Sequence, residues 1–109
     1  MTSARERIST LNDELRIHRK GGKVVITSDV AALPASTILK LDRAIVTFNN
    51  FDVPNDPNGE HDFGKIRVDG IEFFFKIDAY DLSGQYGSPD PSDPTVTLRV
   101  MTIMRADEY

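Results

Sequence analysis

The sequence predicts an α+β fold in which two helices pack on one face of a small, mainly antiparallel sheet, in the order α-β-α-β-β-β. Two observations lead to this prediction. Apolar residues recur at helical spacing in two segments of the first half of the chain. The second half instead holds β-branched and aromatic runs on either side of a tight-turn signal. At 109 residues the chain is long enough for one domain, residues 1–109, with a single core.

The first helix is expected to begin after Ser3 and to end before Gly21-Gly22. Ser3 and Glu6 fit a capping box, in which the two side chains bond free backbone N–H groups of the first turn. Ile8–Leu15 carries an apolar stripe at helical spacing, and glycine commonly follows the last turn of a helix. A short, β-branched and buried strand, residues 23–27, is expected to follow.

The next segment, residues 28–33, is expected to be a connector. Pro34 suits the start of a second helix, where its missing N–H is not needed. The apolar residues of Ile38–Phe48 recur at helical spacing, and Asn49-Asn50 is expected to end this helix. The turn-forming residues that follow, 55–59, predict an ordered loop.

The clearest local signal is Asp69-Gly70, the preferred pair for a two-residue type I′ turn. Alternating runs flank this pair, so Val68 is expected to face Ile71 across a hairpin. In that register Ile66 meets Phe73 on the apolar face. A slip of one residue would turn the apolar set outward, which makes the register a sharp prediction.

The same ladder, continued away from the turn, places Phe63 opposite Lys76 and His61 opposite Asp78. The open end of the hairpin should therefore gather polar residues from both strands. A last strand is expected at Thr95–Met104. Its second half is apolar on both faces, which indicates a central position in the sheet.

The candidate site is this polar end of the hairpin together with the loop that follows it. Residues 1–51 hold eight Lys or Arg against five Asp or Glu, whereas residues 52–94 hold three against ten. Aromatic residues are interleaved with these acids. The residues expected to form a binding surface are Glu60, His61, Asp62, Asp78, Tyr80, Asp81, Tyr86 and Asp90.

An enzymatic role for the same residues is the alternative. His61 beside Asp78 would be a general base with the carboxylate that orients it, and Glu60 could assist. Ser88 or Tyr86 could approach from the loop as a nucleophile. No recognisable catalytic motif supports this arrangement. A His61–Asp78 hydrogen bond that only holds the hairpin end would explain the same pattern.

The sequence predicts neither a metal site nor a cofactor. The chain has no cysteine, and His61 is the only histidine in the polar block. A calcium loop around Asp56–Gly59 does not fit, because the first ligand position would be Pro54 and the twelfth would be Lys65.

The composition favours a protein partner over nucleic acid or a membrane. A net charge of −4 and a pI near 5.0 argue against direct nucleic-acid binding, which depends on neutralising several phosphates. No apolar run approaches the roughly 20 residues that span a bilayer, so the cytoplasm is the expected compartment. Large aromatic side chains in or beside loops are typical interface anchors. The oligomeric state is left open.

Several motifs together resemble those of one family. They are Leu11–Arg16, Gly59–Gly64, Lys76–Asp78 with Tyr80-Asp81, Tyr86–Pro91 and Val100–Met104. The family consists of small proteins known only as a domain of unknown function, frequent in alphaproteobacteria and often carried on plasmids or other mobile elements. Many members have an aromatic residue where this chain has Ala79. The family has no established activity to carry over.

These observations predict a non-enzymatic, cytoplasmic interaction protein. The resemblance adds the hypothesis of a mobile-element accessory that inhibits a host defence complex, of the anti-CRISPR or antirestriction type. The alternative is a small hydrolase or nuclease that uses His61 with Asp78 and nearby carboxylates. A concave, solvent-open site around His61 would favour the enzyme, and a flat acidic and aromatic surface would favour the binding protein.

Overall fold

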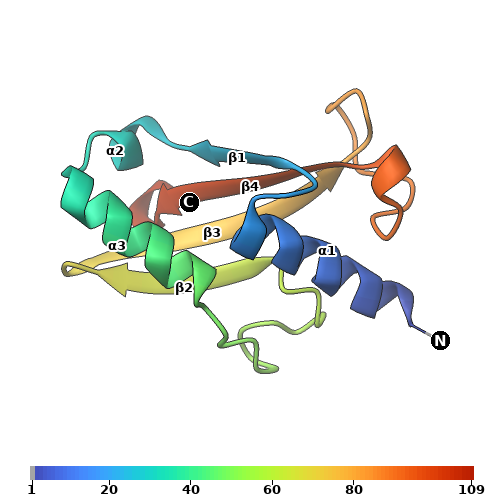
Figure 1. Cartoon of the computed structure of the whole chain (residues 1–109), viewed down its shortest axis with the longest axis horizontal. Coiled ribbons are helices and arrows are strands. Elements are labelled where there is room, and N and C mark those ends of the chain that lie inside the picture. Colours follow the sequence, from blue (N-terminus) through green and yellow to red (C-terminus); the bar gives the residue numbers. More distant parts are fainter. Residues whose placement is uncertain (1) are drawn as a thin grey trace.

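The computed structural model describes residues 2–109 and places the helices on one face of a four-stranded sheet (Figure 1). The order of the strands across the sheet is β1-β4-β3-β2. The helices are α1 (Ala4–His18), α2 (Ser28–Ala31) and α3 (Ala35–Val46). The strands are β1 (Lys23–Ile26), β2 (Phe63–Val68), β3 (Ile71–Tyr80) and β4 (Leu98–Arg105). Two 3₁₀ turns, η1 (Pro94–Val96) and η2 (Ala106–Glu108), flank β4.

The α+β class is confirmed, but the sheet is mixed rather than mainly antiparallel. β3 pairs antiparallel with both β2 and β4, whereas β1 runs parallel to β4. Between β1 and the hairpin the chain passes over the sheet through α2 and α3, and such a helical crossover allows two strands of one sheet to run parallel. The expected order also lacked α2, which begins in the predicted connector where the Thr27 hydroxyl accepts the Val30 N–H at 3.3 Å.

The predicted hairpin register is confirmed. Val68 pairs with Ile71, and Ile66 pairs with Phe73. Asp69 and Gly70 both have positive φ angles (51° and 80°), as a type I′ turn requires. The buried residues of β2 and β3 alternate with residues that face the opposite side of the sheet. The hairpin therefore fixes which side chains reach each face.

Both long helices have identifiable ends. The Ser3 hydroxyl accepts the Glu6 N–H at 3.1 Å, as expected for the start of α1. α3 ends at Val46 rather than at Asn49-Asn50. The buried Arg16 guanidinium of α1 donates to three carbonyl oxygens at that end of α3, from residues 45, 46 and 48, at 2.9, 3.2 and 3.0 Å. A cation at this position also interacts favourably with the negative, C-terminal end of the α3 helix dipole.

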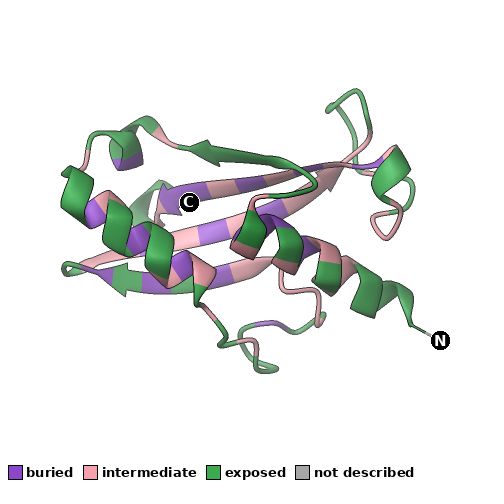
Figure 2. Ribbon diagram, in the orientation of Figure 1, coloured by how far each residue is buried: buried purple, intermediate pink, exposed green. Residues whose placement is uncertain are grey.

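The core lies between the helices and one face of the sheet, as the buried residues in Figure 2 show. Its fully buried members include Leu15 of α1, Ile45 of α3, Phe73 and Phe75 of β3 and Met101 of β4. The four residues of β1 are all exposed, contrary to the expectation of a buried strand. β1 is exposed because it forms the edge of the sheet.

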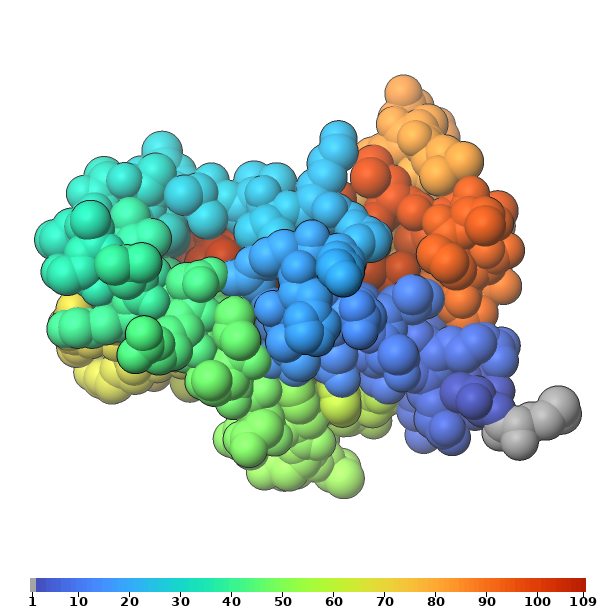
Figure 3. Space-filling model, viewed as in Figure 1, coloured from blue at the N-terminus to red at the C-terminus, as the bar shows by residue number. Residues whose placement is uncertain are grey.

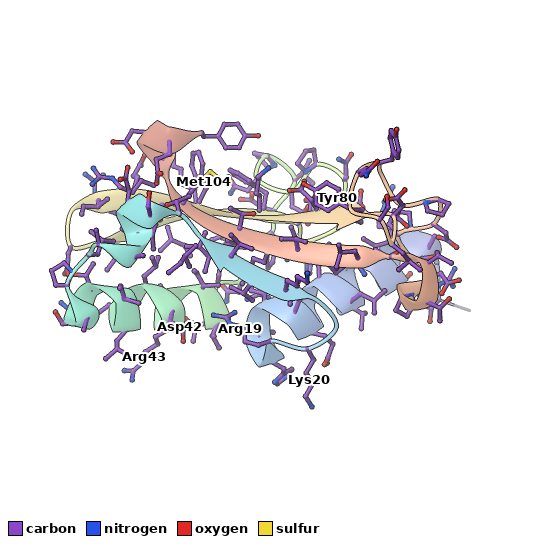
Figure 4. All side chains as sticks on the ribbon, turned by 90° about the horizontal axis from the view of Figure 1, so that it is seen from above. Arg19, Lys20, Asp42, Arg43, Tyr80 and Met104 are labelled. Carbon is purple, nitrogen blue, oxygen red and sulfur yellow. The ribbon has the colours of Figure 1, made fainter. Side chains whose placement is uncertain are left out.

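The opposite face of the sheet carries no α-helix within residues 2–109. Figure 4, seen from above, shows α1 and α3 on one side of the sheet and η2 on the other, with Tyr80 and Met104 toward the η2 side. We call this side the open face. The strand residues that point to it, by alternation with the buried set, include Phe63, Phe74, Lys76 and Asp78.

Candidate functional site

The structure divides the predicted site residues into three groups. The first group, Glu60 and His61, lies beside α1. The second group, Asp62, Asp78 and Tyr80, lies at or near the open face. The third group, Asp81, Tyr86 and Asp90, belongs to the loop between β3 and η1. The polar block is thus not one continuous surface. Each group has its own geometry and is described in turn.

His61 pairs with Asp13 of α1 and not with Asp78. Its Nδ1 lies 3.0 Å and 3.1 Å from the two carboxylate oxygens of Asp13. The predicted ladder continues to Asp62, whose carbonyl accepts the Ile77 N–H at 2.7 Å, but ends there. His61 itself has a positive φ of 56°, which leaves the extended conformation. It therefore turns toward the helices, while the Asp78 carboxylate lies on the open face 3.1 Å from Lys76.

The other contacts of His61 indicate a structural clasp between α1 and the 52–62 loop. Its ring is stacked on Phe51, with centroids 4.0 Å apart and planes within 8°. The buried Asp56 carboxylate accepts the His61 backbone N–H at 3.2 Å and lies 3.8 Å from Nε2. The Asn12 side chain adds a bond to the Glu60 carbonyl at 2.9 Å. A cavity of about 480 Å³ adjoins this clasp, lined in part by Asp13, Phe51 and His61.

Asp62 and Asp78 of the second group line a charged cavity of about 330 Å³ beside the open face. Asp62, Lys76 and Asp78 supply its charged groups. Lys76 and Asp78 project from alternate positions of β3, which places both on the same side of the sheet. Phe63 and the C-terminal Tyr109 also line this cavity.

The charges of this cavity influence one another. Burial raises the pKa of Asp62 above its ordinary value, and the neighbouring Asp56 and Asp78 carboxylates raise it further. The hydrogen bond from Lys76 to Asp78 raises the pKa of the lysine, so the cation is well held at neutral pH. The cavity therefore combines a lysine whose pKa is raised with an aspartate, Asp62, whose pKa is also raised.

Three aromatic rings adjoin this cavity on the open face. The rings of Phe63 and Phe74 lie 5.0 Å apart, and Tyr109 approaches Phe74 edge-on at 5.5 Å. The side chain of Tyr109 is 78% exposed. We call Phe63, Phe74 and Tyr109 the aromatic cluster. It consists of two half-buried rings and the exposed ring of Tyr109, near the Lys76–Asp78 pair.

The third group lies in the loop between β3 and η1, where most polar side chains, including that of the neighbouring Ser88, hold the loop together. The Ser88 hydroxyl contacts the Thr97 hydroxyl at 2.7 Å and accepts the Asp90 N–H at 3.1 Å, so it is engaged in closing the loop rather than placed as a nucleophile. Asp81 accepts the Ser83 hydroxyl at 2.7 Å, a bond that lowers the pKa of Asp81. Tyr86 is 70% exposed at the loop surface.

Sequence reasoning missed several residues of these sites. Asp13 was not singled out, because nothing in a helical pattern shows which loop packs beside it. Tyr109 follows the last predicted strand, and nothing in the sequence shows that it completes the aromatic cluster with Phe63 and Phe74. Arg99 was also missed: it is buried, it donates to Asn12 at 2.7 Å and to the Pro91 carbonyl, and it thus ties α1 to the loop before η1. The signal available for Arg99 was a lone arginine in a strand that is otherwise largely apolar.

Residues 2–109 lack two features that would indicate a function. No group of three or more His, Cys, Asp or Glu side chains has an arrangement that could hold a metal ion. No helix in that range has the length and apolar character needed to cross a membrane.

Comparison with known families places the chain. A family model described as "Protein of unknown function (DUF3768)" matches residues 26–108. The chain belongs to this family. The match to DUF3768 covers the hairpin and the loop before η1; it begins at the last residue of β1 and ends one residue before Tyr109 of the aromatic cluster. Comparisons with curated proteins and with solved structures found no match.

Proposed function

We propose that this protein is a non-enzymatic interaction protein that binds a protein partner through the open face of its sheet. The observation that carries the proposal is the aromatic cluster beside the Lys76–Asp78 pair, on the face opposite the helices. Interfaces draw much of their binding energy from a few aromatic residues within a polar surround. The open face has this composition, because the aromatic cluster lies beside the charged Lys76–Asp78 pair.

The geometry of the open face supports a protein surface as the partner. The lining of the cavity of about 330 Å³ includes a lysine, two carboxylates and two aromatic rings. A partner side chain of either charge would find a counter-ion there, and the rings would cover its apolar portion. The net charge of −4 disfavours nucleic acid as the partner.

The identity of the partner is a further step of the proposal. Membership in a family of unknown function is compatible with many partners. We retain the hypothesis of a mobile-element accessory that acts on a host defence complex, of the anti-CRISPR or antirestriction type. Its support is the family resemblance of the sequence motifs. In this proposal the protein acts in the cytoplasm.

The test compares partner capture by the native protein and by two variants. Tyr109→Ala removes an exposed ring of the aromatic cluster, and Leu39→Ala is the matched control, an equally exposed side chain (71%) of α3 on the helical side. Affinity capture from a native host, quantified by mass spectrometry, identifies the partner. Loss of a hot-spot ring lowers the binding free energy by about 2 kcal/mol or more. We therefore expect the affinity for the partner to fall at least about 30-fold in Tyr109→Ala and to stay unchanged in Leu39→Ala. Equal capture by both variants would contradict the proposal.

A small hydrolase or nuclease is the second candidate, and the Asp13–His61 pair is the observation that favours it. The carboxylate fixes Nδ1 of the imidazole, as an orienting acid does for a general base, and a cavity of about 480 Å³ adjoins the pair. Asp78, placed beside His61 in the sequence-based hypothesis, is on the other face of the sheet. Asp13 takes its role in this version.

Substitution of His61 distinguishes a structural role of this residue from a catalytic one. We expect His61→Gln to show the same activity as the native protein toward nucleic acid, peptide and ester substrates, while amide exchange in the 52–62 loop becomes faster because the bond to Asp13 is weakened. Asp29→Asn, at an exposed position of α2, serves as the control. An activity of the native protein that disappears in His61→Gln with unchanged circular dichroism would favour the enzyme instead.

A further inference from the structure

β1 is an exposed edge strand made almost entirely of large aliphatic residues. The exposed fractions of Val24, Val25 and Ile26 are 39%, 46% and 44%. One side of β1 pairs with β4, and no strand of the described chain lies on the other side. Figure 3 shows this segment, in light blue, along the upper rim of the molecule. Native proteins usually protect such edges, because an open edge can pair with another chain.

The free backbone groups of this edge can be assigned. The N–H of Thr27, just after β1, donates to the Ile103 carbonyl of β4 at 3.2 Å. Backbone groups of a strand point to alternate sides at successive residues, so Val25 and Lys23 also direct their groups to β4. The N–H and C=O groups of Val24 and Ile26 therefore point outward, away from the sheet.

We propose that this edge binds a second copy of the same chain, with the two β1 strands antiparallel about a two-fold axis at Val25. In this register Val24 forms the hydrogen-bonded pair with Ile26 of the second copy, so both outward residues use their free groups. Val25 faces Val25 of the second copy as a non-hydrogen-bonded pair. The sheet then continues across both protomers.

Two neighbouring registers also satisfy the backbone but pair the side chains poorly. An axis at Val24 places Val25 opposite Lys23 and Ile26 opposite Gly22. An axis at Ile26 places Val25 opposite Thr27, at the very end of the strand. Only the axis at Val25 sets each of the three aliphatic residues against another aliphatic residue, and it therefore buries the most apolar surface.

The charges around the edge complement each other in this register. Lys23 lies opposite Thr27 of the second copy. The Thr27 hydroxyl donates to the Glu108 carboxylate at 3.0 Å, so Lys23 meets a carboxylate across the interface, and the symmetry produces this ion pair twice. This charge complementarity favours a second copy over an unrelated strand.

The interface is closed, and it lies along the β1 edge rather than over the aromatic cluster. A two-fold axis pairs the same patch on both protomers, so the assembly stops at a dimer. The aromatic cluster is on β2, β3 and the C-terminus, and β2 is the edge strand opposite β1 in the strand order. The dimer would therefore carry two open faces, and its existence does not depend on the function proposed for them.

A cysteine at the two-fold axis tests the proposal directly, because the native chain contains none. Residues of a non-hydrogen-bonded antiparallel pair have Cα atoms about 4.5 Å apart, within the range that a disulfide spans. We expect Val25→Cys to form a covalent dimer under mild oxidation with oxidised glutathione. Non-reducing electrophoresis measures the rate, which should exceed that of Val24→Cys and of Leu39→Cys at least tenfold.

The two control cysteines identify the source of any cross-link. Val24 faces Ile26 of the second copy, which separates the two Val24 residues too far for a disulfide, and Leu39 reports random collisions. Light scattering of the native protein should give the dimer mass, and Val25→Lys, with two charges opposed at the axis, should give the monomer mass. A monomeric native protein, or a cross-linking rate of Val25→Cys equal to the controls, would overturn the proposal.

Discussion

Replacing Arg16 with Met is expected to lower the free energy of unfolding by about 3 kcal/mol or more. Arg16 is buried, and its guanidinium bonds three carbonyl oxygens at the end of α3 and the Asp13 carboxylate. The guanidinium also lies over the Phe51 ring, 5.2 Å from its centroid. Met preserves much of the apolar stem but leaves buried carbonyl oxygens without donors, which is costly.

Urea unfolding followed by circular dichroism measures this effect. The matched control is Arg7→Met, because Arg7 is exposed on the same helix and makes one surface bond, to the Thr2 carbonyl at 2.8 Å. We expect the control to change stability by no more than about 0.5 kcal/mol. If Arg16→Met were as mild as the control, the capping of α3 from α1 would not be a main source of stability.

Replacing Gly64 with Ala is expected to destabilise the protein by about 1–3 kcal/mol or more. A Cβ at this position would lie inside the van der Waals distance of the Phe75 ring and 2.9 Å from the Phe48 ring. The two rings pack edge to face with centroids 5.2 Å apart, and Phe75 is fully buried, so its ring cannot move without disturbing the core. The cost therefore comes from overpacking.

Gly87→Ala is the matched control for this substitution. Gly87 has open space where a Cβ would be added, and its backbone is outside the left-handed region. Thermal unfolding should give a clearly lower midpoint for Gly64→Ala and a nearly native midpoint for Gly87→Ala. Similar midpoints for the two variants would mean that the aromatic packing around Gly64 is adaptable.

The sequence predicted the parts of the fold that depend on local chemistry. The Asp69-Gly70 turn sets the register of β2 and β3, since it demands two positive φ angles and the flanking alternation admits one pairing. The cap at Ser3 was equally predictable. The parallel neighbour of β4 was not, because the residues of β1 contain no information about a partner near the other end of the chain.

The candidate site was predicted in composition but not in arrangement. The ladder correctly placed Lys76 opposite Phe63, and the polar residues do lie at the open end of the hairpin. One left-handed residue, His61, moved its own side chain to the helical face and ended the ladder. Non-glycine residues with positive φ are uncommon, and a sequence gives little warning of them.

The pairing of the first strand with the last has a consequence for how the chain is made. β1 leaves the ribosome well before β4, the one strand beside it within residues 2–109. Until then the aliphatic strand has no partner, and closing so long a segment is entropically costly and slow. The growing polypeptide must carry an unpaired aliphatic segment until β4 has been synthesised, so the arrival of β4 commits this domain to its native sheet.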